Sequence, residues 1–225
     1  MIRIPIGLDL TAIILGALAG GLAARRHDFD LAGALFLAVS CGVGGGVARD
    51  LVLGDGPPVA LREPWLLPAA LAGGACIHFG GHLLDLAPAV IARRADAAYV
   101  WLDSGSLALY GIIGTAKAEA FHLPAVSCVA VGVLAATGGA IIRDVVVNER
   151  PQVFLPGHLY AVAAATGCTL FLLLQEATRR PNLSAVVGGA LIVAVRVVSY
   201  LRNWSTAPAR RHGPRTPTGR DNPTP

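Results

Sequence analysis

The chain has 225 residues, of which 54% are hydrophobic and 14% are charged, and its mean hydropathy is +0.61. A soluble domain carries about 25% charged residues, so this chain has too little charge to cover a surface in water. These values exclude an ordinary soluble protein and predict an integral membrane protein. The net charge of +4 does not indicate nucleic-acid binding, because most basic residues fall in short turns or near the C-terminus, as in membrane proteins.

Seven stretches of the chain are apolar enough and long enough to cross the hydrocarbon layer, which takes about 17–25 helical residues. In chain order they are Leu8–Ala24, Leu31–Ala48, Trp65–Leu86, Ala97–Ala116, Pro124–Ile142, Val153–Gln175 and Leu183–Leu201. Backbone groups in lipid must pair within their own segment, and the alternation typical of barrel strands is absent. The sequence therefore predicts an all-α integral membrane protein with seven transmembrane helices.

The breaks between these stretches are short and carry charged residues or proline, such as Arg93-Arg94. We expect one transmembrane domain over residues 1–204 and a disordered basic tail over 205–225, because the tail is rich in proline and lacks apolar periodicity. Counting Arg and Lys on alternate sides of the membrane places the N-terminus outside and the C-terminus in the cytoplasm.

An internal repeat appears when the sequence is compared with itself at an offset of 94 residues. The matched charged residues are Asp9 with Asp103, Arg49 with Arg143, and Asp50 with Asp144. The predicted units are repeat 1 over about 7–92, repeat 2 over about 97–176, and a seventh helix over about 182–203. Each repeat holds three helices, so the second enters the membrane from the opposite side. The predicted architecture is an inverted 3+3 repeat plus one helix, with a permeation path or binding site between the repeats.

Consecutive glycines occupy matching places in the two repeats, as Gly44, Gly45 and Gly46 in the second predicted helix and as Gly138 and Gly139 in the fifth. Glycine in membrane helices commonly serves close helix packing. It also permits a kink that exposes backbone carbonyl oxygens, which suits a path for cations. We favour the second interpretation for these two clusters.

The pairs Arg49-Asp50 and Arg143-Asp144 follow the glycines within about one turn. An arginine at the middle of a membrane helix costs about 2.5–3.5 kcal/mol, so a symmetric pair of them requires an explanation. One interpretation is that they lie at helix ends and form salt bridges that lock the repeats together. The other is that they lie at a pore wall, where the carboxylate attracts cations and the arginine tempers their flow.

Three further charged residues are candidates for the same site. Asp9 and Asp103 begin the first and fourth predicted helices, where a carboxylate in the first turn is stabilised by the helix dipole. Lys117, the single lysine of the chain, ends the fourth helix. Its ammonium group either extends to the membrane interface or faces a cavity and gates ion flow.

The sequence does not favour a metal site or an enzyme. His78 and His82 are spaced for one helix face with Asp85 beyond them, but no further cluster of ligands accompanies them. We find no phosphate loop, nucleophile elbow or dinucleotide fingerprint in a suitable context. We therefore expect no catalytic residue, no resident metal and no cofactor.

Taken in order on this repeat, the segments Gly44–Asp50, Gly114–Ala118 and Gly138–Asp144 resemble one family, the prokaryotic members of the trimeric intracellular cation (TRIC) channels, whose bacterial relatives are also labelled glycine-transporter-domain proteins. The resemblance covers about residues 7–201. It implies a homotrimer with one potassium-conducting pore in each protomer, lined mainly by the first, second, fourth and fifth helices. It also implies that the two glycine clusters, the two Arg-Asp pairs and Lys117 belong to the pore.

The resemblance is incomplete in two respects. Ala140 stands where a third glycine would complete the second cluster, and the Lys-Glu-Val motif by which animal members bind a phosphoinositide is absent. The leading hypothesis is a potassium-permeable channel of the bacterial inner membrane, in contact with membrane lipids. The alternatives are a secondary transporter of a small zwitterion such as glycine, and a structural membrane scaffold.

Overall fold

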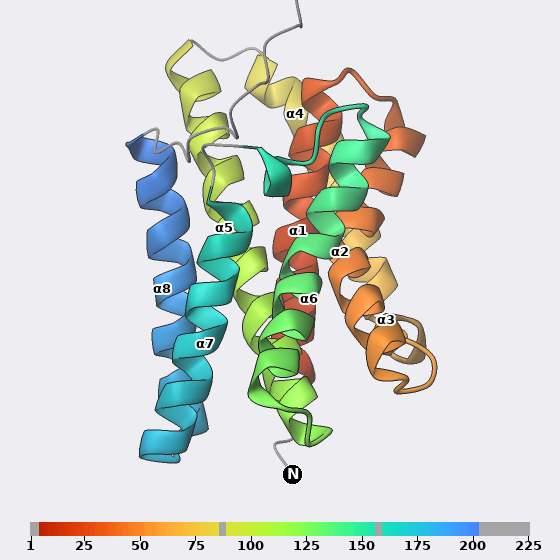
Figure 1. Ribbon diagram of the computed structural model, residues 1–225. Coiled ribbons are helices and arrows are strands. Elements are labelled where there is room, and N and C mark those ends of the chain that lie inside the picture. The colour runs from red at the N-terminus through yellow and green to blue at the C-terminus, as the bar shows by residue number, and fades with distance from the viewer. Residues whose placement is uncertain (1–4, 86–88, 156–158, 203–225) are drawn as a thin grey trace, which may run out of the picture.

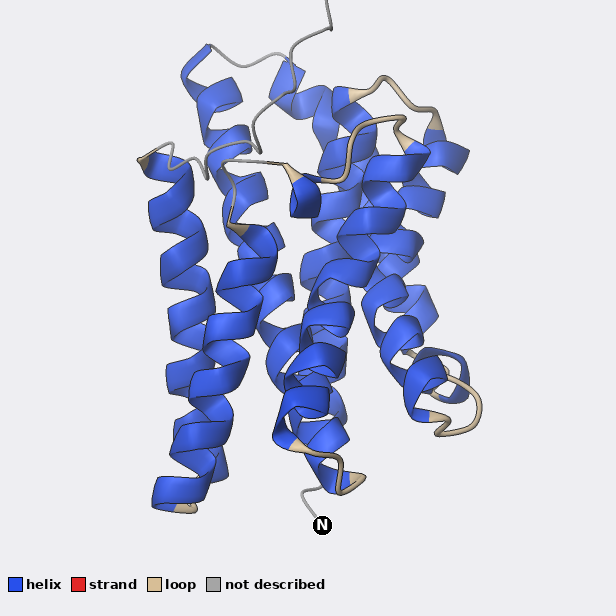
Figure 2. Cartoon of the chain, in the orientation of Figure 1, coloured by secondary structure: helices blue, strands red, loops and turns tan. Residues whose placement is uncertain are grey.

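The computed structural model describes residues 5–85, 89–155 and 159–202, with side chains described outside 82–96. All regular structure in these residues is helical (Figures 1 and 2). The elements are α1 (Ile6–Arg26), α2 (Leu31–Leu53), α3 (Val59–Arg62), α4 (Leu66–Asp85), α5 (Ala89–Ala120), α6 (Ala125–Val146), η1 (Gln152–Phe154), α7 (Tyr160–Thr178) and α8 (Pro181–Leu201). The predicted tail over 205–225 lies outside the described residues.

Local sequence explains where several of these helices begin and end. The Asp30 side chain caps α2 by accepting a hydrogen bond of 2.8 Å from the Gly33 N–H. Gly54 ends the same helix in the left-handed conformation, with a φ of 64° that glycine adopts without strain. Pro181 begins α8, where the missing N–H of proline costs no helical hydrogen bond.

Among the described helices, α1, α2, α6, α7 and α8 are each long and apolar enough to cross a membrane. The apolar part of α4 is shorter and spans Leu66–Gly81. Helix α5 extends over 32 residues and includes Arg93 and Arg94, where the sequence predicted a break between segments. The predicted sixth segment began at Val153, whereas that residue belongs to η1 and α7 begins at Tyr160.

The long helices alternate in direction along the bundle (Figure 1). In that view α1 rises, α2 descends and α4 rises, whereas α5 descends, α6 rises and α7 descends before α8 rises. Helix α1 packs against α2, α4 and α5, and α5 packs in turn against α6, α7 and α8. The α2–α6 contact joins the first three long helices to the next three.

Glycines allow α2 and α6 to approach closely where they cross. A Cβ atom on Gly139 would lie 2.5 Å from the Cys41 carbonyl oxygen, and one on Gly45 would overlap the Ala135 carbonyl oxygen. Both helices continue without interruption through their glycines, which are buried. The small residues therefore place the two backbones in contact, as in other closely packed membrane helices.

Gly45→Ala should lower the unfolding free energy by about 1–3 kcal/mol, because the added methyl group forces the α2–α6 contact apart. The matched control is Gly189→Ala in α8, where the nearest atom to an added Cβ is Ile112 Cγ1 at 3.9 Å. Thermal unfolding of both variants in one detergent measures the difference. Equal midpoints for the two variants would contradict the packing role of Gly45.

Candidate functional site

Two clusters of ion-paired and hydrogen-bonded side chains, most of them buried, lie near opposite ends of the bundle. The first, which we name the α2 cluster, consists of Asp9, Arg49, Asp50, Asp55 and Lys117. Arg49 is 1% exposed, and its Nη1 lies 3.1 Å from Asp9 Oδ1 while its Nε donates to Asp50 Oδ1 at 2.7 Å. One arginine thus joins the first turn of α1 to the last turns of α2, with both carboxylates held as ion pairs inside the protein.

Lys117 brings a second cation to the α2 cluster from the last turn of α5. Its Nζ lies 2.8 Å from Asp50 Oδ1 and 2.6 Å from Asp55 Oδ2, so the ammonium group is held between two carboxylates. The hydrogen bond from Lys117 lowers the pKa of Asp55 below its usual value. Partial burial raises this pKa, but a second hydrogen bond, from Arg62, lowers it further. Asp55 is therefore ionised at neutral pH and keeps Lys117 paired.

The second group, which we name the α6 cluster, consists of Asp103, Arg143, Asp144, Tyr160 and Arg196. Nη1 of Arg143 donates to Asp103 Oδ1 at 2.9 Å, and its Nε donates to Asp144 Oδ1 at 2.8 Å. The Tyr160 hydroxyl donates to Asp103 Oδ1 at 3.1 Å, and Arg196 Nη2 donates to Asp103 Oδ2 at 3.2 Å. Four helices, α5 to α8, supply these side chains.

The aspartates that follow Arg49 and Arg143 also organise the backbone beyond each helix. Asp50 Oδ2 accepts a hydrogen bond of 2.8 Å from the Val59 N–H, and Asp144 Oδ2 accepts one of the same length from the Gln152 N–H. Each carboxylate thus binds an arginine with one oxygen and caps the following short helix with the other.

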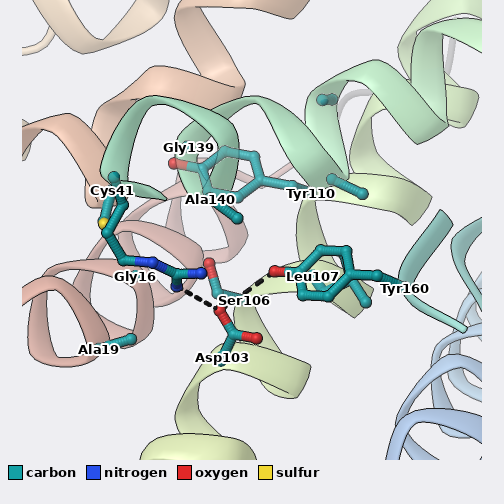
Figure 3. Close-up of a pocket in the computed structure, with 13 residues that line it drawn as sticks. Gly16, Ala19, Cys41, Asp103, Ser106, Leu107, Tyr110, Gly139, Ala140 and Tyr160 are labelled. Atoms are coloured by element: carbon teal, nitrogen blue, oxygen red, sulfur yellow. Dashed lines mark hydrogen bonds and ion pairs between the residues drawn. The ribbon is translucent and has the colours of Figure 1, made fainter. Parts of the chain in front are cut away.

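A cavity of about 20 Å³ lies between the α2–α6 crossing and the α6 cluster. Asp103, Ser106, Tyr110, Arg143 and Tyr160 supply its polar lining, and Figure 3 shows the Asp103 carboxylate joined to the Tyr160 hydroxyl by a hydrogen bond. This volume suffices for about one water molecule. The Tyr110 hydroxyl also donates a hydrogen bond to the Gly42 carbonyl oxygen of α2, so the interior is narrow and polar in this conformation.

The structure assigns the predicted glycines to the centre of the bundle. Gly44 lies against Gly139, whose Cα is 3.2 Å from an added Cβ on Gly44, and Gly138 lies near Gly45. Gly46 instead faces the ring of Tyr110. The glycines thus serve the helix packing that the sequence analysis considered, and Gly139 also lines the cavity.

The structure corrects the interpretation of Asp103 as a residue that begins a helix. Asp9 lies in the first turn of α1, but Asp103 lies far inside α5, which begins at Ala89. The charge of Asp103 is therefore stabilised by its buried arginine partners and not by the end of a helix. Arg49 pairs with Asp9 in the first half of the chain, and Arg143 pairs with Asp103 in the second. Lys117 of α5 forms an ion pair with Asp50 and so connects the two halves.

The sequence pattern did not predict a role for Arg196 or Tyr160. Arg196 is 2% exposed within the apolar α8, and its guanidinium lies 4.4 Å from the centre of the Tyr160 ring. A lone charged residue in an apolar membrane segment was the available signal for Arg196. Among the described residues no group of three potential metal ligands occurs, and the side chains of His82 and Asp85 lie outside that description.

Arg49→Met should destabilise the protein by about 3–5 kcal/mol, because it leaves the carboxylates of Asp9 and Asp50 short of a partner inside the protein. The control is Arg62→Gln, which breaks an ion pair with Asp55 whose two side chains are 42% and 31% exposed. An exposed pair of this kind is worth about 0–1 kcal/mol. Chemical denaturation in mixed micelles measures both effects, and a loss from Arg62→Gln as large as that from Arg49→Met would contradict this account.

The comparisons with known proteins agree on one family. The family model described as "Glycine transporter" matches residues 6–82 and 100–176. A "UPF0126 membrane protein" of Deinococcus radiodurans is 37% identical over 91% of this chain and 91% of its own length. The "UPF0126 inner membrane protein YadS" of Escherichia coli strain K12 is 31% identical over 71% of this chain and 73% of its own length.

Two solved structures to which the chain is similar are TRIC channels. The TRIC trimeric intracellular cation channel orthologue from Rhodobacter sphaeroides superposes with a TM-score of 0.77 at 29% identity, over 88% of this chain and 97% of that one. A prokaryotic TRIC channel in 0.5 M KCl gives a TM-score of 0.79 at 24% identity, over 88% of this chain and 96% of that one, and supports the fold alone. The chain therefore belongs to the family described as "Glycine transporter", and it is an all-helical, multi-pass membrane protein with the fold of the prokaryotic TRIC channels.

Proposed function

We propose that the protein is a passive cation channel of a bacterial inner membrane, conducting potassium and other monovalent cations. The observation that carries this proposal is the likeness, at 29% identity and over 88% of the chain, to the trimeric intracellular cation channel orthologue from Rhodobacter sphaeroides. The same likeness supports a homotrimer with one pore in each protomer. The name of the Escherichia coli relative supports the inner membrane as its location.

The proposed architecture has seven transmembrane helices arranged as an inverted repeat plus one. Helices α1, α2 and α4 form the first unit, α5, α6 and α7 form the second, and α8 stands alone. The two matches of one family model lie 94 residues apart, and the corresponding helices run in opposite directions in Figure 1. An odd number of crossings puts the two termini on opposite sides, and the arginine distribution favours a cytoplasmic C-terminus.

The proposed path runs through each protomer from the α2 cluster, past the α2–α6 crossing, to the α6 cluster. The carboxylates of Asp50 and Asp103 attract cations near its two ends, while the polar cavity beside Gly139 lies between them. Each carboxylate is neutralised by arginine in this conformation, and the cavity admits about one water molecule. These features support a closed state in which the charged groups hold the path shut.

Lys117 is the proposed gate at the α2 cluster. Its ammonium lies between Asp50 and Asp55, at 2.8 and 2.6 Å, and there it takes the position that a permeant cation would need. Opening then requires that the lysine leave both carboxylates. The Lys117 side chain is 14% exposed and therefore borders solvent.

A transporter of a small zwitterion such as glycine is the second candidate, favoured by the description of the family model. Inverted repeats with a central site are shared by channels and transporters. The central cavity of about 20 Å³ holds about one water, which is less room than a glycine molecule occupies. Saturable uptake of labelled glycine by proteoliposomes would support this candidate.

Lys117→Gln should increase the open probability in planar-bilayer recordings several-fold, because it removes the cation that lies between Asp50 and Asp55. Lys117→Arg keeps the charge and serves as the matched control, with gating close to that of the wild type. Unitary currents in symmetric KCl measure both variants. A Lys117→Gln channel that gates as the wild type does would contradict the assignment of Lys117 as a gate.

A further inference from the structure

Arg196 is a buried charged residue of α8, the helix that lies outside both matches to the family model. Those matches end at residue 176, whereas α8 covers Pro181–Leu201. Placing an arginine inside a membrane helix costs about 2.5–3.5 kcal/mol unless the side chain finds partners. The guanidinium of Arg196 has such partners in Asp103, Tyr160 and Gln152.

The hydrogen bonds on Asp103 divide between its two oxygens. Oδ1 accepts from Arg143 at 2.9 Å and from Tyr160 at 3.1 Å. Oδ2 accepts from Arg196 at 3.2 Å, and within the described part of the chain Arg196 is the one donor on that oxygen. Asp103 also lines the small polar cavity (Figure 3). Arg196 thus controls the second oxygen of a carboxylate that borders the interior space.

The charges of the α6 cluster balance only when Arg196 is counted. Asp103 and Asp144 carry two negative charges, and Arg143 carries one positive charge, so Arg196 brings the sum to zero. The α2 cluster obtains its corresponding extra cation, Lys117, from α5. The α2 cluster has three carboxylates against Arg49 and Lys117, so it becomes neutral only with Arg62, which pairs with Asp55. At the α6 end the last cation belongs to α8.

We propose that Arg196 is a tethered counter-cation that regulates the affinity of the α6 cluster for permeant cations by occupying Oδ2 of Asp103. This inference rests on the proposed channel function and deepens it. With Arg196 in place, Asp103 is neutralised and binds cations weakly. When α8 shifts away from α5, the carboxylate oxygen turns to the cavity and becomes a binding group for a monovalent cation.

A purely structural role makes a different prediction for the same residue. If Arg196 only anchors α8 through Tyr160 and Gln152, its replacement lowers stability but leaves the concentration dependence of conduction unchanged. If it acts as a counter-cation, its replacement changes the potassium concentration at which conductance is half-maximal. Conductance measured against potassium concentration therefore separates the two roles.

The test uses the full-length protein in planar bilayers, with unitary conductance recorded over a range of KCl concentrations. Arg196→Gln should lower the half-saturating potassium concentration by about tenfold, equivalent to about 1.4 kcal/mol of added attraction. Arg196→Lys keeps the charge and should stay near the wild-type value. Arg202→Gln, at the exposed C-terminal end of the same helix, is the control for a change of charge on α8.

Asp103→Asn and the double variant Asp103→Asn/Arg196→Gln keep the proposal testable if Arg196→Gln alone fails to fold. Asp103→Asn leaves Arg196 uncompensated and should raise the half-saturating concentration, and the second substitution should restore it toward the wild-type value. Wild-type conduction with no effect of Arg196→Gln in either background would overturn the inference alone. A wild-type protein that is folded and inserted but does not conduct would overturn the proposed function together with it.

Discussion

The ion pairs between buried arginines and aspartates are the interaction on which the arrangement of this protein depends. A charged group inside a membrane protein is tolerated when it is paired and hydrogen-bonded, and costs several kcal/mol when it is not. Arg49 therefore fixes α1 against the end of α2, and Arg143 fixes α5 against the end of α6. The same pairing requirement holds Lys117 on Oδ1 of Asp50, which it shares with Arg49, and Arg196 on Oδ2 of Asp103.

The glycine contact between α2 and α6 makes this arrangement possible. Because Gly45 and Gly139 present no side chain, the two helices cross with their backbones in contact at the centre of the bundle. Their C-terminal ends, which carry the Arg-Asp pairs, then lie at opposite ends of the molecule (Figure 1). Tight packing at the centre and neutralised charge at both ends leave the narrow polar interior that the proposed channel function requires.

Much of the fold follows from hydropathy, since each predicted apolar segment corresponds to a helix in the structure. The matched charges at an offset of 94 residues also pointed to both Arg-Asp pairs. The partners of those pairs could not be predicted, because hydropathy says nothing of which helices meet. The prediction that Asp103 begins a helix was therefore wrong, and its pairing with Arg143 was not foreseen. Arg196, its second partner, was not identified because it lies in a helix that the repeat does not include. The length of α5 escaped prediction because helical structure continues through the charged Arg93.

The most direct test of the channel function is recording from the purified wild-type protein in a planar bilayer under a potassium chloride gradient. The account predicts discrete unitary steps whose currents reverse near the potassium equilibrium potential. Silence across the voltage range from folded, inserted protein, together with saturable uptake of labelled glycine in proteoliposomes, would contradict it.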